Sequence, residues 1–188
     1  MLDFCVVNHT ALRYSKKALM SIILLRRTRK NGAPVSFALT GQENFAMKRD
    51  QFKFFHDLRV RYAEVDSQGI VFNAHYLTYF DTAITGYMRN INYDYHTLVP
   101  RRGLDFHLIK STVEYLKPIG FDEMIEIGVT TQKIGKSSLT WVLAIFRKGR
   151  AECLAKGEIV WVCSRVGTNK SHPLPEDLLK LLSEHENP

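Results

Sequence analysis

Residues 62–81 read YAEVDSQGIVFNAHYLTYFD, and this stretch changes character halfway. Its first half is polar and contains Asp66-Ser67-Gln68-Gly69, a sequence that predicts a turn. Its second half carries aromatic residues at helical spacing, and Asn73 stands between the halves as the predicted N-cap of a helix. Asp66 therefore has two interpretations. It is either an ordinary turn aspartate that closes an Asx-turn, or a carboxylate held near the start of a helix to do chemistry.

Downstream of Asn73, the spacing of apolar residues predicts a long helix from residue 74 to about residue 91. These residues form a stripe that is too broad for a helix lying on a protein surface. A helix of this kind needs other elements wrapped around it. The apolar positions are Tyr76, Leu77, Tyr79, Phe80, Ala83, Ile84, Tyr87, Met88 and Ile91.

The segments on either side of this helix have the pattern of a sheet. Residues 52–62 are strand-like, and four further strands are predicted near residues 105–117, 123–134, 138–148 and 151–165, with short turn signals between them. Residues 175–182 predict a short closing helix. A strand, a long helix and then an antiparallel meander indicate an α+β fold, in which a sheet of about five antiparallel strands wraps a long central helix.

The formal net charge of the 188 residues is +7, and most of it belongs to the N-terminal segment. Residues 1–48 hold eight basic and two acidic residues, whereas residues 49–188 hold 18 basic and 17 acidic ones. The strand pattern begins within six residues of Met47. We therefore expect residues 1–46 to be a basic N-terminal extension, either disordered (as a targeting arm would be) or not native, and residues 47–188 to be one domain. A nucleic-acid-binding body is not indicated.

The cysteines Cys5, Cys153 and Cys163 have no C-x-x-C spacing, which favours neither a disulfide framework nor a zinc site. Such cysteines are typical of the reducing cytoplasm. The longest apolar run near the N-terminus, residues 18–25, is shorter than the roughly 20 residues that a membrane helix needs. We predict a cytoplasmic protein with no membrane span and no metal.

The order of elements and the motif at the strand-to-helix junction resemble the hotdog-fold acyl-CoA thioesterases of the 4-hydroxybenzoyl-CoA thioesterase type. The resemblance runs from about residue 52 to residue 183, with weaker similarity at residues 113–118 and 134–138. The residues that carry it are Arg61, Tyr62, Asp66, Gly69, Ile70, Val71, Asn73, Tyr76 and Asp81.

This resemblance implies a homodimer or homotetramer, in which subunits pair edge to edge and active sites lie between them. It also implies that Asp66 is the catalytic carboxylate and that Tyr62, common in one branch of the family, belongs to the catalytic set. That branch has a histidine where this chain has Asn73. A general-acid role that needs an imidazole at this position is therefore not carried over.

The implied reaction is hydrolysis of a fatty or aromatic acyl-CoA to a free acid and CoA. Asp66 would attack the thioester or deprotonate a water, and backbone N–H groups near Asn73 would stabilise the oxyanion. This chemistry needs no metal and no cofactor other than the coenzyme A of the substrate. We therefore predict a catalytic set of Asp66, Asn73 and Tyr62.

Substrate binding is expected to involve Gly69, Ile70, Val71 and Tyr76 around the turn. Asp81 either faces the acyl group or makes a structural hydrogen bond. Basic residues are expected to meet the phosphates of coenzyme A. The best candidate is Lys136 with Ser137 and Ser138, and the next candidates are Lys117, Arg147 and Lys148.

Three alternative functions remain. A non-catalytic acyl-CoA or acyl-carrier binding module would bind without releasing a thiol. A hotdog 3-hydroxyacyl dehydratase would place a histidine opposite a carboxylate, and the sequence has no such pair at the corresponding positions. Nucleic-acid binding through residues 1–46 would depend steeply on salt.

Overall fold

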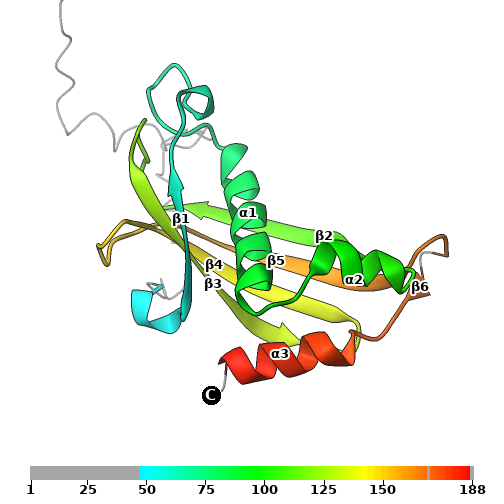
Figure 1. The fold of residues 1–188 in the computed structure, drawn as a ribbon. Helices are drawn as coiled ribbons and strands as arrows, with labels where there is room; N and C mark the ends of the chain where they lie inside the picture. Colours follow the sequence, from blue (N-terminus) through cyan, green and yellow to red (C-terminus); the bar gives the residue numbers. More distant parts are fainter. Residues whose placement is uncertain (1–46, 169, 187–188) are drawn as a thin grey trace, which may run out of the picture. The chain divides into compact units, whose positions relative to one another are not determined.

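A long helix, α1 (His75–Asn90), lies across an antiparallel sheet in the computed structural model of the chain, which describes residues 47–168 and 170–186 (Figure 1). All described residues belong to one compact unit. The predicted N-terminal extension, residues 1–46, lies outside them. The strands are β1 (Phe54–Arg59), β2 (Leu104–Tyr115), β3 (Met124–Ile134), β4 (Ser138–Arg147), β5 (Cys153–Arg165) and β6 (Lys170–Ser171). The other helices are η2 (Arg49–Gln51), η3 (Tyr62–Glu64), α2 (Tyr95–Arg101) and α3 (Glu176–Glu186).

The sheet has the order β1-β3-β4-β5-β2, and β6 pairs with β5. All of its pairings are antiparallel. Strand β1 pairs with β3 from Phe54 opposite Val129 to Arg59 opposite Met124. Strand β2 ends the sheet on the other side, and its pairing with β5 is interrupted at Ile109. Helix α1 contacts both edge strands as well as β3, which means that the sheet curls around it.

The close approach of α1 to the sheet depends on Gly157 in β5. A Cβ atom at this position would clash with the ring of Phe80 on α1 and with the carbonyl oxygen of Thr112 on β2. Glycine therefore makes the space that the Phe80 ring fills. Phe80, Ala83, Ile84 and Tyr87 of α1 are fully buried.

The outer face of the sheet carries a second, smaller apolar cluster. Phe52 packs edge-to-face on Phe146, and Met47 lies against the same group. The guanidinium of Arg49 lies 4.0 Å from the centre of the Phe55 ring and 2.6 Å from the Glu126 carboxylate. The segment before β1 is therefore part of the packed domain.

The predicted fold class is confirmed, with small differences at the element boundaries. The strand expected over residues 52–62 is shorter: β1 begins two residues later, and η3 starts at its predicted end. Helix α2 and strand β6 were not predicted. No helix among the described residues is both long and apolar enough to cross a membrane.

Candidate active site

Asp66 lies in a tight turn that folds residues 65–71 back on themselves. Its backbone N–H donates to the carbonyl of Ile70 at 2.9 Å, and its carbonyl accepts from the Gly69 N–H at 2.9 Å. Gly69 has a φ of +74°, a conformation that glycine adopts at little cost. The carboxylate Oδ1 accepts from the Gln68 N–H at 2.7 Å, which is an Asx-turn. Asp66 is only half-buried, and its Oδ2 accepts no hydrogen bond from the described residues.

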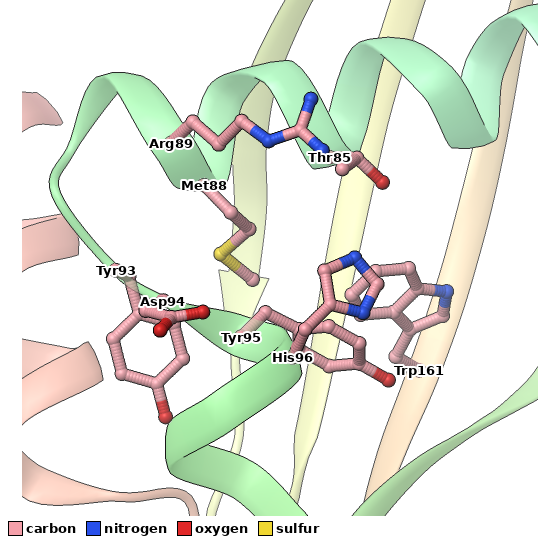
Figure 2. Close-up of a pocket in the computed structure, with 8 residues that line it drawn as sticks. All are labelled: Thr85, Met88, Arg89, Tyr93, Asp94, Tyr95, His96 and Trp161. Carbon is pink, nitrogen blue, oxygen red and sulfur yellow. The ribbon is translucent and has the colours of Figure 1, made fainter.

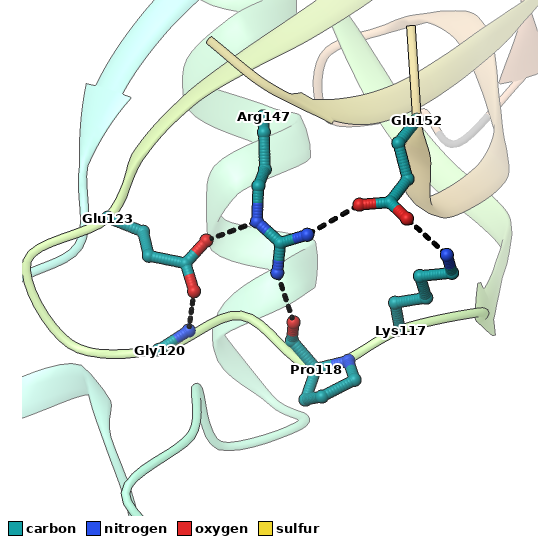
Figure 3. A network of polar contacts seen from close by, with 6 residues as sticks. All are labelled: Lys117, Pro118, Gly120, Glu123, Arg147 and Glu152. Atoms are coloured by element: carbon teal, nitrogen blue, oxygen red, sulfur yellow. Dashed lines mark hydrogen bonds and ion pairs between the residues drawn. The ribbon is translucent and has the colours of Figure 1, made fainter. Parts of the chain in front are cut away.

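Residues 70–71, which follow this turn, are held by the loop at residues 117–123. The Val71 N–H donates to the Ile119 carbonyl at 2.9 Å, and Ile70 forms a β-bridge with Gly120. Figure 3 shows how ionic contacts brace this loop. The Arg147 guanidinium binds Glu123, Glu152 and the Pro118 carbonyl, and Glu123 accepts from the Gly120 N–H at 2.9 Å.

Helix α1 begins at His75, one residue later than predicted. Its N-cap is Ala74, in a helical conformation, and no side chain caps it, so the predicted capping role of Asn73 is wrong. The chain already turns at residues 73–74, where the His75 N–H donates to the Phe72 carbonyl at 3.0 Å. Within the described chain, the N–H groups of Asn73 and Ala74 have no acceptor.

Tyr115, at the end of β2, packs over this helix start. Its hydroxyl donates to the Asn73 carbonyl at 3.3 Å, and its ring lies 4.8 Å from that of Tyr76, edge to face. Burial, followed by the nearby Tyr115 and Glu123, raises the pKa of Tyr76. The side chains of Tyr76 and Val71, both predicted to bind substrate, are buried in the core and stabilise the fold.

Glu64, which the sequence analysis did not single out, is a buried carboxylate two residues before Asp66. Glu64 is 3% exposed. It accepts hydrogen bonds from the Arg61 side chain and backbone and from the hydroxyl of Tyr79 on α1. Burial alone would raise the pKa of Glu64, but these hydrogen bonds outweigh it and lower the pKa. The spacing of Arg61 and Glu64, three residues apart, was a sequence signal for their ion pair.

Other predicted side chains point to solvent. Tyr62 is 80% exposed, and its ring lies 5.8 Å from that of Phe121. Asp81 is exposed on α1 and makes no hydrogen bond with any described residue, which removes the structural hydrogen bond as its role within this part of the chain. It lies close enough to Tyr95 to help raise the pKa of that half-buried phenol, after burial itself and Asp105.

The predicted phosphate-binding residues are not brought to Asp66 in one chain. Lys136, Ser137 and Ser138 lie at the turn between β3 and β4, whereas Asp66 follows the end of β1 that pairs with the start of β3. The length of β3 separates the two places, about 33 Å for eleven extended residues.

The weaker candidates for phosphate binding are already in ion pairs. Lys117 and Arg147 both contact Glu152 (Figure 3), and Lys148 contacts Asp57. Lys136 is exposed and has no carboxylate partner among the described residues. Lys136 therefore remains the best basic candidate.

A small cavity lies at the opposite end of α1 from Asp66, between α1, α2 and β5 (Figure 2). It combines aromatic and polar side chains, and none of the predicted site residues lines it. Its lining residues are Thr85, Met88, Arg89, Tyr93, Asp94, Tyr95, His96 and Trp161. The described residues contain no group of three or more side chains that could hold a metal ion.

The comparisons with known proteins point in one direction. Residues 68–154 match the model of the thioesterase superfamily. A putative esterase of Aquifex aeolicus is 25% identical over 131 residues, which cover 70% of this chain and 98% of that protein. The acyl-CoA thioester hydrolase YbgC of Escherichia coli is 28% identical over 122 residues, which cover 65% of this chain and 90% of that protein.

A solved structure shows the same fold. The 1,4-dihydroxy-2-naphthoyl-CoA thioesterase Slr0204 from Synechocystis superposes with a TM-score of 0.67 at 16% identity, covering 72% of this chain and 98% of that one. At this identity the likeness is one of fold.

Proposed function

Because residues 68–154 match the thioesterase superfamily, we propose that the chain hydrolyses the thioester of an acyl-CoA with Asp66 as the catalytic carboxylate. One observation carries this proposal. The half-buried Asp66 carboxylate precedes a helix start at which the N–H groups of Asn73 and Ala74 have no acceptor in the described chain. A carboxylate and free N–H donors near a helix N-terminus are the groups that this chemistry needs.

The reaction has two possible first steps. In one, Asp66 takes a proton from a water, and the water oxygen attacks the thioester carbon. In the other, the Asp66 carboxylate itself attacks and forms a mixed anhydride, which water then hydrolyses. In both, the carbonyl oxygen becomes an oxyanion that accepts from backbone N–H groups, and the C–S bond breaks to release the thiolate of coenzyme A.

The site is proposed to be complete only in a pair of subunits. Among the described strands β2 has one partner, β5, and its Leu108 and Ile109 are 57% and 61% exposed. An open edge of this kind is normally paired or protected. Pairing with a second copy would also offer a route by which the Lys136 turn of one subunit approaches Asp66 of the other.

The acyl group is proposed to run along α1 towards the cavity at its far end (Figure 2). Thr85 follows His75 by ten residues, a distance of about 15 Å along the helix axis. Asp81 lies between them on α1 and is exposed. Thr85→Phe is expected to lower kcat/KM for long-chain acyl-CoAs and to leave short ones unchanged, because the new ring fills the cavity. Equal loss with every chain length would contradict this path.

The free thiols of Cys153 and Cys163 suit a reducing compartment, and we propose that the reaction takes place in the cytoplasm.

Thiol release from a panel of acyl-CoAs tests the proposed activity, and Asp66→Asn tests the residue. The amide keeps the acceptor for the Gln68 N–H, so we expect little change in the free energy of unfolding. Loss of the nucleophile or base should lower kcat by about 10²- to 10⁴-fold.

Asp57→Asn is the matched control. Asp57 is an aspartate on β1 in an ion pair with Lys148, and its substitution should leave kcat unchanged. If Asp66→Asn lowered the melting temperature while the folded protein kept its normal kcat, Asp66 would be only a turn residue. If no acyl-CoA released thiol but the chain bound acyl-CoA, it would be a binding module.

A further inference from the structure

We propose that Glu64 is a positioning residue for Asp66, and that it acts through the hydroxyl of Tyr79. This inference rests on the proposed function, because it assigns Glu64 the task of fixing the catalytic carboxylate relative to the start of α1. Glu64 would touch neither the substrate nor the reacting atoms.

The first support is geometric. The Oε2 atom of Glu64 accepts from the Arg61 N–H at 2.7 Å and from the Tyr79 hydroxyl at 2.9 Å. Its Oε1 atom accepts from Nε and Nη2 of Arg61 at 2.9 Å and 2.6 Å. One carboxylate thus joins the segment that enters the Asp66 turn to the second turn of α1.

The backbone of Glu64 makes a further link. Its carbonyl accepts from the Phe72 N–H at 2.9 Å, which closes the loop that contains Asp66. Phe72 is followed at once by Asn73 and Ala74, whose N–H groups are the proposed oxyanion donors. Glu64 and Phe72 therefore join the two ends of the loop that separates the Asp66 carboxylate from these donors.

The second support is the cost of the arrangement. A buried carboxylate is unfavourable unless it is paired and hydrogen-bonded. An Asx-turn such as that of Asp66 does not need a second, buried carboxylate in order to form. The Glu64 side chain accepts four hydrogen bonds, which use both of its oxygens and fix the Asp66 loop against α1. A requirement of the site for a fixed distance between Asp66 and the start of α1 would explain why a carboxylate is buried at position 64.

The experiment compares two tyrosines of α1 in the full chain. Tyr79 is 1% exposed and donates to Glu64, and Tyr87 is 0% exposed and donates to Glu186 at 2.7 Å. Tyr79→Phe should lower kcat by about 10- to 100-fold with little change in KM, because a displacement of about 1 Å at a reacting group can cost 100-fold. Tyr87→Phe should cost a similar amount of thermal stability and leave kcat unchanged.

A double variant separates positioning from general damage. In an Asp66→Asn background, Tyr79→Phe should cause no further loss of the residual activity, because the group that it positions is gone. Glu64→Gln should lower kcat as Tyr79→Phe does, and Tyr79→Phe still decides the question if Glu64→Gln does not fold.

The outcomes distinguish this inference from the proposed function. If Asp66→Asn loses activity but Tyr79→Phe keeps its kcat, or if the two losses simply multiply, the positioning role is wrong and the thioesterase proposal stands. If Asp66→Asn keeps full activity, the catalytic role of Asp66 and the positioning role of Glu64 both fail.

Discussion

At the scale of single residues, the N–H group of Asn73 matters more to the proposed chemistry than its side chain. The Asn73 side chain makes no hydrogen bond with a described residue, and its N–H is one of two donors before α1 that have no acceptor in the described chain. A role for the N–H alone agrees with the presence of asparagine here, where one branch of the family has a histidine. A backbone donor does not depend on the side chain.

Asn73→Pro and Asn73→Ala test this directly. Alanine keeps the N–H, whereas proline removes it. Asn73 lies before α1, and its N–H makes no hydrogen bond within the described chain that proline would break. We expect Asn73→Pro to lower kcat by about 10²- to 10³-fold, the cost of one oxyanion donor. Asn73→Ala should change kcat far less. Circular dichroism would verify that both variants fold, and equal losses in the two would show that the side chain is what acts.

Contacts between residues close in the sequence are easier to predict than contacts between distant ones. The turn at Asp66 could be predicted because local residue types define it. The contact between Glu64 and Tyr79 could not, because the two residues lie 15 positions apart in the sequence and meet only when the helix packs on the loop. The ion pairs of Lys117 and Arg147 escaped prediction for the same reason. They join residues on different strands and loops.

At the scale of elements, α1 and β4 were predictable because each keeps one period over ten or more residues. Strands β2, β3 and β5 were predictable as long runs of strand-forming residues bounded by turn signals. Helix α2 was missed because it has seven residues and contains Pro100. The predicted start of α1 was one residue early because Asn73 favours caps in general, whereas here the preceding turn makes that capping bond unnecessary.

The close contact between β5 and α1 depends on the missing side chain of Gly157. Gly157→Ala should destabilise the fold by about 1–3 kcal/mol, because the added methyl group overpacks the contact between β5 and α1. Chemical denaturation would measure this loss. In the double variant with Phe80→Leu, only the ring contact is relieved, since the Thr112 carbonyl belongs to the backbone. An unchanged midpoint for Gly157→Ala would mean that α1 lies further from the sheet than described.

At the scale of the whole molecule, the open edge of β2 predicts an oligomer. Ile109→Lys should shift the protein towards monomer, because a charge at the edge opposes pairing with a second strand. We expect activity per chain to fall with it, since the proposed site needs two subunits. Sedimentation velocity would measure the oligomeric state, and thiol release would measure the activity per chain in the same samples.

Val166→Lys is the matched control for this variant. Val166 is 59% exposed and follows β5 rather than lying on β2, so its substitution should leave both the size and the activity unchanged. An unaltered protein that sedimented as a fully active monomer at micromolar concentration would overturn the two-subunit site.

The packing of Met47, Arg49 and Phe52 on the outer face of the sheet has a consequence for shortening the chain. We propose that the domain begins at Met47, and a gene truncated to that codon should yield soluble protein. Truncation to the first residue of β1 would instead uncover Phe146 and leave the nearly buried Glu126 without its cation. The two truncations differ by seven residues, and soluble expression of the shorter one at the yield of the longer would show that the segment before β1 is dispensable.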